Sequence, residues 1–219
     1  MYRTILFDFD GTLVPSLELW LRAFQYAIAQ YGREIPEQTI IDRFYYRDYS
    51  DVCAEFGFPS ADELRDHVHD GLTIAYQSAE LFDGARELLG AVKAAGMKTG
   101  LVTSSPRLQV STALSLLGID GAFDTIVTGD DIVNYKPHPE PVLLALSRLE
   151  ETPDGALFVG DYIFDVLAGN AAGVTTALFL PDRHTRFYDF DKLRATGPDL
   201  VFSSYHDLGK HLGLAQTTK

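Results

Sequence analysis

Two aspartates stand two positions apart after an apolar run near the start of the chain. Residues 4–7 are followed by Asp8, Phe9, Asp10 and Gly11. In an extended strand, alternate side chains share a side, so the two carboxylates can converge while Phe9 turns toward the core. Gly11 then allows a sharp bend. Convergent carboxylates repel one another, which indicates a hard cation and a reaction, with an Asp-rich turn or calcium loop as the alternative.

Hydroxyl residues follow a second apolar run. Thr103, Ser104 and Ser105 come directly after residues 99–102 and just ahead of a predicted helix. Hydroxyl groups and free N–H groups at the start of a helix form an anion-binding site. An ordinary helix cap by Ser105 would give the same residues.

Charged residues follow two later apolar runs. Lys136 lies in a loop that Pro137 and Pro139 stiffen, which favours a positioned charge over a solvated one. Asp161 and Asp165 are four positions apart, so they can share one face of a starting helix. The alternative for Asp165 is a simple interaction with the helix dipole.

The rest of the chain predicts how these residues are brought together. Helical spacing without a convincing strand marks residues 15–80, whereas residues 1–14 and 81–219 alternate between strands and helices. Further strands are predicted at residues 99–102, 123–127, 156–159, 174–180 and 199–202. This alternation predicts an α/β core with a parallel sheet covered on both faces, whose strands present ligands at their carboxyl ends.

Composition limits the class of protein. The chain has 219 residues, of which 46% are hydrophobic, and Cys53 is its one cysteine. This excludes a disulfide framework and a cysteine-based zinc site and favours the cytoplasm. No apolar run reaches a membrane span, and the early first strand leaves no room for a signal peptide. The net charge of −13 argues against nucleic acid or a membrane as the main partner.

The motifs together resemble those of the haloacid dehalogenase-like (HAD) hydrolase superfamily. The residues that carry the resemblance are Asp8-Phe9-Asp10-Gly11-Thr12, Thr103-Ser104-Ser105, Lys136-Pro137 and Gly160-Asp161 with Asp165. The resemblance implies a Rossmann-like, doubly wound core over residues 1–14 and 81–219, and a helical cap over residues 15–80. Residues 130–141 look most like the phosphoglycolate phosphatase and pyrophosphatase branch.

The resemblance also implies a reaction and its residues. Asp8 would attack phosphorus to form an aspartyl-phosphate, and Asp10 would act as general acid and base. Thr103 and Lys136 would hold the phosphoryl oxygens. The implied Mg²⁺ ligands are Asp8, Asp10, Asp161 and Asp165, and Gly11, Thr12, Ser104 and Ser105 belong to the implied phosphate-binding set. The expected substrate is a small phosphorylated metabolite, and the expected state is a monomer or homodimer.

The sequence leaves some alternatives to a phosphatase open and argues against others. Asp10 argues against a dehalogenase, and the absence of lysine before Lys93 argues against a phosphonate hydrolase that uses a cap lysine. A β-phosphoglucomutase-like sugar-phosphate mutase shares the core motifs and is the second candidate. A non-catalytic phosphate-binding or regulatory protein is a third, although every expected catalytic position is filled.

Substrate selectivity is expected from the cap. Residues 15–80 carry twelve Asp and Glu against five Arg and no Lys, so a donor to an anionic leaving group must be arginine or uncharged. Arg43 and Arg47 flank an aromatic stretch in the least regular part of the cap and are predicted to bind the leaving group. The alternative is that both pair with neighbouring acids such as Asp42, Asp48 and Asp51.

Overall fold

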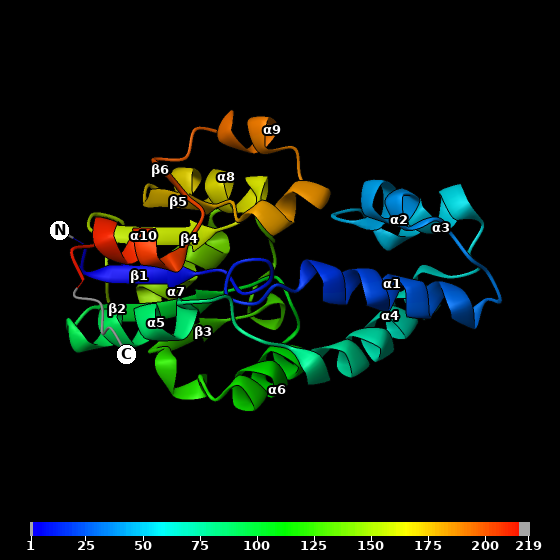
Figure 1. Cartoon of the computed structure of the whole chain (residues 1–219), viewed down its shortest axis with the longest axis horizontal. Helices are drawn as coiled ribbons and strands as arrows, with labels where there is room; N and C mark the ends of the chain where they lie inside the picture. Colours follow the sequence, from blue (N-terminus) through cyan, green and yellow to red (C-terminus); the bar gives the residue numbers. More distant parts are fainter. Residues whose placement is uncertain (1, 215–219) are drawn as a thin grey trace. The chain divides into compact units, whose positions relative to one another are not determined.

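The computed structural model describes residues 2–214 and contains a six-stranded parallel sheet (Figure 1). The strands are β1 (Thr4–Phe7), β2 (Lys98–Val102), β3 (Thr125–Val127), β4 (Ala156–Gly160), β5 (Thr175–Phe179) and β6 (Leu200–Phe202). Their order is β3-β2-β1-β4-β5-β6. The predicted Rossmann-like α/β fold is therefore confirmed, with β1 at the centre of the sheet.

Helices cover both faces of this sheet. The core helices are α5 (Ala85–Ala94), α6 (Arg107–Leu117), α7 (Glu140–Arg148), α8 (Ile163–Ala172), α9 (Phe190–Arg194) and α10 (Tyr205–His211). Short turns of 3₁₀ helix are η2 (Asp120–Ala122), η3 (Gly129–Asp131) and η4 (Asp182–Arg186). Helices α7 and α8 pack on one face, and α5 and α10 on the other.

Burial explains why the central strands are apolar throughout. All four residues of β1 and all five of β4 are buried. Side chains from the sheet, such as Leu6 and Phe158, form one apolar cluster with Val142 and Ala168 of the covering helices. A strand covered on both faces needs apolar residues at successive positions, which is why it reads as a continuous run.

A second unit is entirely helical over its described residues. It consists of α1 (Leu17–Gln30), α2 (Glu37–Phe44), α3 (Tyr49–Phe56), α4 (Ala61–Ala75) and η1 (Tyr76–Ser78). Helices α1 and α4 pack along one another, and the ring of Phe24 contacts those of Phe44 and Tyr45. The Ser60 hydroxyl accepts the Glu63 N–H at 3.3 Å, as its capping motif predicts.

The chain divides into these two units at the ends of the helical insertion. Internal contacts group residues 16–79 in one unit and the remainder in the other, whereas the sequence predicts an insertion over residues 15–80. The two segments that lead into and out of the insertion are joined within the core, because the Phe82 N–H donates to the Leu13 carbonyl oxygen at 3.0 Å. The chain therefore leaves the core for the insertion and re-enters it at neighbouring points.

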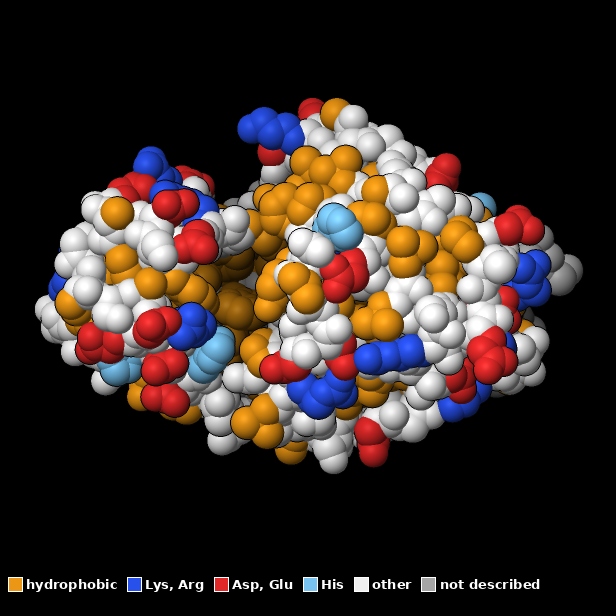
Figure 2. All heavy atoms as spheres, turned by 180° about the vertical axis from the view of Figure 1, so that it is seen from behind, with side chains coloured by type: hydrophobic (Ala, Val, Ile, Leu, Met, Phe, Trp, Pro, Cys, Tyr) orange, Lys and Arg blue, Asp and Glu red, His pale blue; other side chains and the backbone are white. Residues whose placement is uncertain are grey.

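The surface carries both signs of charge. Figure 2 shows acidic and basic side chains interspersed over the displayed face, without a continuous basic surface there. None of the helices in the described part of the chain is long and apolar enough to cross a membrane.

Candidate active site

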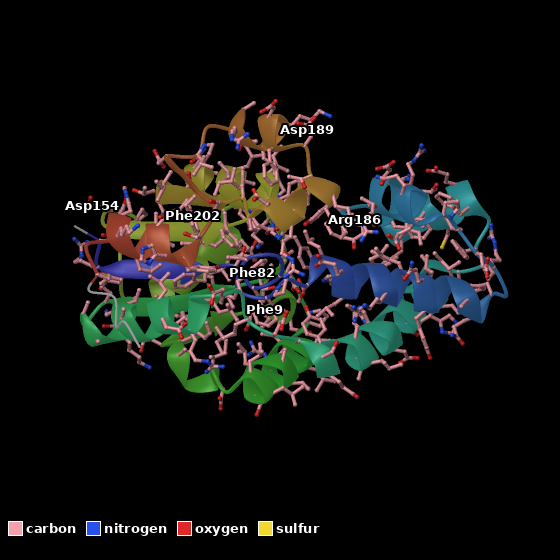
Figure 3. All side chains as sticks on the ribbon, viewed as in Figure 1. Phe9, Phe82, Asp154, Arg186, Asp189 and Phe202 are labelled. Carbon is pink, nitrogen blue, oxygen red and sulfur yellow. The ribbon has the colours of Figure 1, made fainter. Side chains whose placement is uncertain are left out.

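The predicted residues of the core meet at the carboxyl edge of the sheet. Asp8 directly follows β1, Thr103 follows β2, and Asp161 follows β4. All three are almost completely buried: the exposed fraction is 5% for Asp8 and 1% for both Thr103 and Asp161. Phe9, labelled in Figure 3, is buried as well. Polar groups removed from water in this way need partners or a bound ion.

Lys136 bridges two of the carboxylates. Its Nζ lies 2.6 Å from Asp8 Oδ1 and 2.6 Å from Asp165 Oδ1, and it also donates to the Val102 carbonyl oxygen at 3.4 Å. Burial alone would lower the pKa of Lys136, but the charges of Asp165 and Asp8 outweigh it and raise the pKa. The ammonium group is therefore firmly protonated, which gives the site its positive charge.

Asp8 is the carboxylate that Lys136 and its acidic neighbours influence in opposite directions. The pKa of Asp8 is raised to about 7, chiefly by burial; the charge of Lys136 opposes this rise, and the charge of Asp165 adds to it. A nearby cation favours the ionised form of a carboxyl group, and a nearby anion disfavours it. Further positive charge at this site would therefore keep Asp8 ionised and able to act as a nucleophile.

Three carboxylates form a group that could hold a metal ion. Oxygen atoms of Asp8, Asp161 and Asp165 all lie within 4.8 Å of one another, and all three residues are buried. Burial, followed by the charges of Asp165 and Asp8, raises the pKa of Asp161 well above its ordinary value. Buried, mutually repelling carboxylates are the donor set that a hard divalent cation would neutralise, so the residues present fit such an ion.

Asp10 is turned toward a different partner. Its Oδ2 accepts the Ser105 hydroxyl at 2.6 Å, and its side chain is not part of the acidic group found among residues 2–214. The Thr103 hydroxyl accepts the Ser105 N–H at 3.1 Å within the loop after β2, and the hydrogen bond from Ser105 to Asp10 joins this loop to the one after β1. Helix α6 begins at Arg107 with Pro106 at its cap, so the Ser105 side chain positions Asp10 instead of capping the helix.

The turn after Asp10 must come very close to Asp161. Gly11 has a φ of +75°, and a Cβ atom there would lie 2.1 Å from Asp161 Oδ2. Any side chain would therefore both strain the backbone and clash. The hydroxyl of Thr12 donates toward Asp8 Oδ2 and Asp161 Oδ1 at 3.5 and 3.4 Å. The turn after β1 therefore packs directly against Asp161, which follows the neighbouring strand β4.

The two cap arginines have a local acidic partner. Arg43 pairs with Glu55 at 2.5 Å, and Arg47 pairs with the other oxygen of Glu55 at 2.6 Å. The pairing alternative therefore has a structural basis, although Glu55 supplies it and not the three acids named from the sequence. A role for the arginines in substrate binding stays a prediction.

Two residues near the acidic group are not among the site residues predicted from the sequence. The Tyr188 hydroxyl donates to Asp161 Oδ2 at 2.9 Å, and His184 Nδ1 lies 3.7 Å from the same oxygen. Burial lowers the pKa of His184 to about 3, so its ring is neutral at pH 7. Both residues follow β5, where the same rule about carboxyl ends of strands could have drawn attention to them.

Comparison with known proteins places the chain in a family. A family model for haloacid dehalogenase-like hydrolases matches residues 5–179. The chain therefore belongs to the haloacid dehalogenase-like hydrolase family, as the motifs predicted.

The relatives include proteins named as phosphatases. The pyrophosphatase PpaX of Bacillus cereus (strain G9842) is 36% identical over 215 residues, with 94% of each chain covered. The phosphoglycolate phosphatase of Salmonella paratyphi A is 33% identical over 245 residues, which cover 97% of this chain and 93% of the relative. A Thermotoga maritima structure provisionally named beta-phosphoglucomutase has a TM-score of 0.80 and 23% identity, covers 97% and 100% of the two chains, and supports the fold alone.

The buried acidic group predicts a measurable cost to stability. Because the pKa of Asp161 is raised in the folded state, its ionisation favours the unfolded chain. The stability of the folded protein therefore falls as the pH rises above the unfolded-state pKa of this residue. Asp161→Asn is therefore expected to raise the unfolding temperature of the EDTA-treated protein at pH 7, and the gain should shrink toward pH 4. Differential scanning calorimetry measures this gain.

The exposed Asp154, labelled in Figure 3, offers a matched control. Asp154→Asn should leave the unfolding temperature nearly unchanged across the same pH range. An Asp161→Asn protein that is less stable than wild type at pH 7 without metal would contradict the expectation.

Proposed function

We propose that the protein is a Mg²⁺-dependent phosphatase that hydrolyses a small phosphorylated metabolite through an aspartyl-phosphate intermediate. The observation that carries this proposal is the buried Asp8, with Lys136 at 2.6 Å and two further carboxylates close by. The relatives named pyrophosphatase PpaX and phosphoglycolate phosphatase support a phosphate monoester of the phosphoglycolate type, or pyrophosphate, as substrate.

Charge balance supports a divalent cation. Asp8, Asp161 and Asp165 bring three negative charges when ionised, a phosphate dianion adds two, and Lys136 offsets one. Side-chain oxygens of these three aspartates and the Asp10 carbonyl oxygen would hold Mg²⁺, which prefers hard oxygen ligands. When bound, Mg²⁺ would supply the positive charge that lets a phosphate approach the carboxylates.

The side chains divide the work of hydrolysis. An oxygen of Asp8 attacks phosphorus as the bond from phosphorus to the leaving oxygen breaks, and Asp10 gives its proton to that oxygen. Asp10 then takes a proton from the water that attacks the aspartyl-phosphate, which releases phosphate and restores Asp8. Lys136 and Thr103 hold the phosphoryl oxygens, and the 2.6 Å contact from Ser105 orients Asp10.

A panel of phosphorylated metabolites with Mg²⁺ tests this function directly. Release of inorganic phosphate from phosphoglycolate, pyrophosphate or another small ester is the expected result. Formation of glucose 6-phosphate from β-glucose 1-phosphate without phosphate release would instead establish the sugar-phosphate mutase. Binding of phosphate esters without turnover of any of them, including an aryl phosphate, would establish a binding protein.

Selectivity provides a further prediction for the cap arginines. Arg47→Ala and Arg43→Ala are each expected to lower kcat/KM on the best metabolite by about 10- to 150-fold, corresponding to about 1.5–3 kcal/mol for a charged hydrogen bond. The loss on an aryl phosphate should be small, since that leaving group offers no matching anion. Steady-state kinetics on both substrates measures the difference.

The shared ion-pair partner of the two arginines is the natural control. Glu55→Gln removes the partner of both arginines while leaving their charges in place. If the arginines bind substrate, Glu55→Gln should retain kcat/KM on both substrates. Wild-type kinetics in both arginine variants would mean that their role is to pair with Glu55.

A further inference from the structure

Tyr188 contacts the acidic group from the segment that follows β5. Its residue is 9% exposed, and its hydroxyl donates to Asp161 Oδ2 at 2.9 Å. We infer that Tyr188 is a positioning residue that fixes the Asp161 carboxylate for cation binding and thereby sets the affinity of the site for a divalent metal. The inference rests on the proposed function, because it assumes that the acidic group holds a cation.

The two oxygens of Asp161 have different surroundings. Oδ2 is enclosed by the Tyr188 hydroxyl and by the Gly11 backbone, where a Cβ atom would be 2.1 Å away. Oδ1 lies 3.4 Å from the Thr12 hydroxyl, which also reaches Asp8 Oδ2 at 3.5 Å. Tyr188 therefore holds one oxygen of Asp161, while the Thr12 hydroxyl links the other oxygen to the Asp8 carboxylate.

Burial makes a protein donor necessary for this orientation. Only 1% of Asp161 is exposed, so bulk water cannot hold its carboxylate. A full hydrogen bond at 2.9 Å from a phenol is a stronger restraint than the long contact from Thr12. Groups behind a metal ligand that fix its orientation typically change metal affinity by about 10- to 100-fold when they are removed.

The ring of Tyr188 is itself held in place. Its centroid lies 5.1 Å from that of Tyr162 and 5.4 Å from that of His184. His184 packs in turn against Phe82 and Phe179, and its carbonyl oxygen accepts the Tyr188 N–H at 2.9 Å. Figure 3 labels Phe82 within the core unit. This aromatic packing limits the positions of the hydroxyl, so the loop after β5 acts as a rigid support.

Tyr188→Phe removes the hydroxyl and retains the ring, and the test is metal binding without substrate. Metal-free full-length protein is titrated with Mn²⁺, and free Mn²⁺ is counted by electron paramagnetic resonance. We expect the Mn²⁺ dissociation constant to rise about 10- to 100-fold in Tyr188→Phe. In turnover assays, saturating Mg²⁺ should restore most of kcat, because the variant weakens metal binding and removes no reacting group.

A second buried tyrosine provides the matched control. The Tyr205 hydroxyl donates to the Thr12 carbonyl oxygen at 2.6 Å, so Tyr205→Phe also removes one buried hydroxyl beside the same loop. We expect its Mn²⁺ dissociation constant to stay within about threefold of wild type, even if its unfolding temperature falls. An equal loss of affinity in both variants would overturn the inference, since it would reflect general loosening of the site.

The remaining outcomes are also decisive. A folded Tyr188→Phe protein with wild-type Mn²⁺ affinity would refute the positioning role while leaving the phosphatase proposal intact. Wild-type protein that binds no Mn²⁺ and needs no metal for turnover would refute the metal site itself. If Tyr188→Phe does not fold, Tyr188→Gln, which keeps a donor, should bind Mn²⁺ at least tenfold more tightly than Tyr188→Leu, and equal affinities would overturn the inference.

Discussion

Asp8→Asn is expected to lower turnover by at least about 10⁴-fold, because the variant retains the shape of the nucleophile and loses its charge. Removal of one member of a catalytic unit commonly costs several powers of ten. Lys136 would keep its contact with Asp165 at 2.6 Å, so the fold should survive. Phosphate release measures the loss, and circular dichroism with an unfolding curve verifies that the variant is folded.

A covalent intermediate gives this prediction a second measurement. Wild-type protein mixed with a labelled substrate and quenched in acid should retain a phosphoryl group on Asp8, and Asp8→Asn should retain none. Near-wild-type turnover in the variant would end the proposal that Asp8 is the nucleophile. Loss of turnover in both Asp8→Asn and Asp154→Asn would indicate damage unrelated to the site, since Asp154 is exposed.

Removal of divalent cations is expected to have the second large effect. Treatment with EDTA should reduce activity by about 10³-fold or more, as expected if the bound cation contributes about 4 kcal/mol to the transition state. Mg²⁺ should restore activity, and Ca²⁺ should restore it poorly because its larger and looser coordination shell would misplace Asp8. Initial rates against metal concentration measure each effect.

Thermal unfolding separates binding of the metal from its use in the reaction. Mg²⁺ should raise the unfolding temperature of wild-type protein, because a ligand that binds the folded state stabilises it. In Asp161→Asn the same addition should have little effect, since one of the three clustered carboxylates is gone. Full activity in metal-free buffer would contradict the proposal and would favour the dehalogenase alternative.

The parts of the site that could be predicted are those fixed by strand ends. Asp8, Thr103 and Asp161 each follow an apolar run, and parallel strands must bring their carboxyl ends to one edge. The fold followed from the same alternation of strands and helices, which is typical of a parallel sheet covered by helices. The local pattern of apolar runs agrees with the architecture of the sheet, so short stretches of sequence were sufficient to predict these residues and the fold.

Other contacts depend on which loops meet in space. Tyr188 lies 27 positions from Asp161, and no local spacing connects them. The Ser105 hydroxyl has two plausible local uses, and its choice of Asp10 depends on the approach of another loop. In the helical insertion, α2 and α3 are short helices on either side of the aromatic stretch, and the rings of Phe44 and Phe56 pack between them at 4.9 Å.

The hydrogen bond between Phe82 and Leu13 has a consequence for how this chain can diversify. Because of this hydrogen bond, the helical insertion begins and ends at neighbouring points of the core, as a long loop does. The entropic cost of closing such a loop grows only slowly with its length. Replacing residues 16–79 by an insertion of another size should therefore disturb the sheet little, so that substrate range and catalytic chemistry can change independently in evolution.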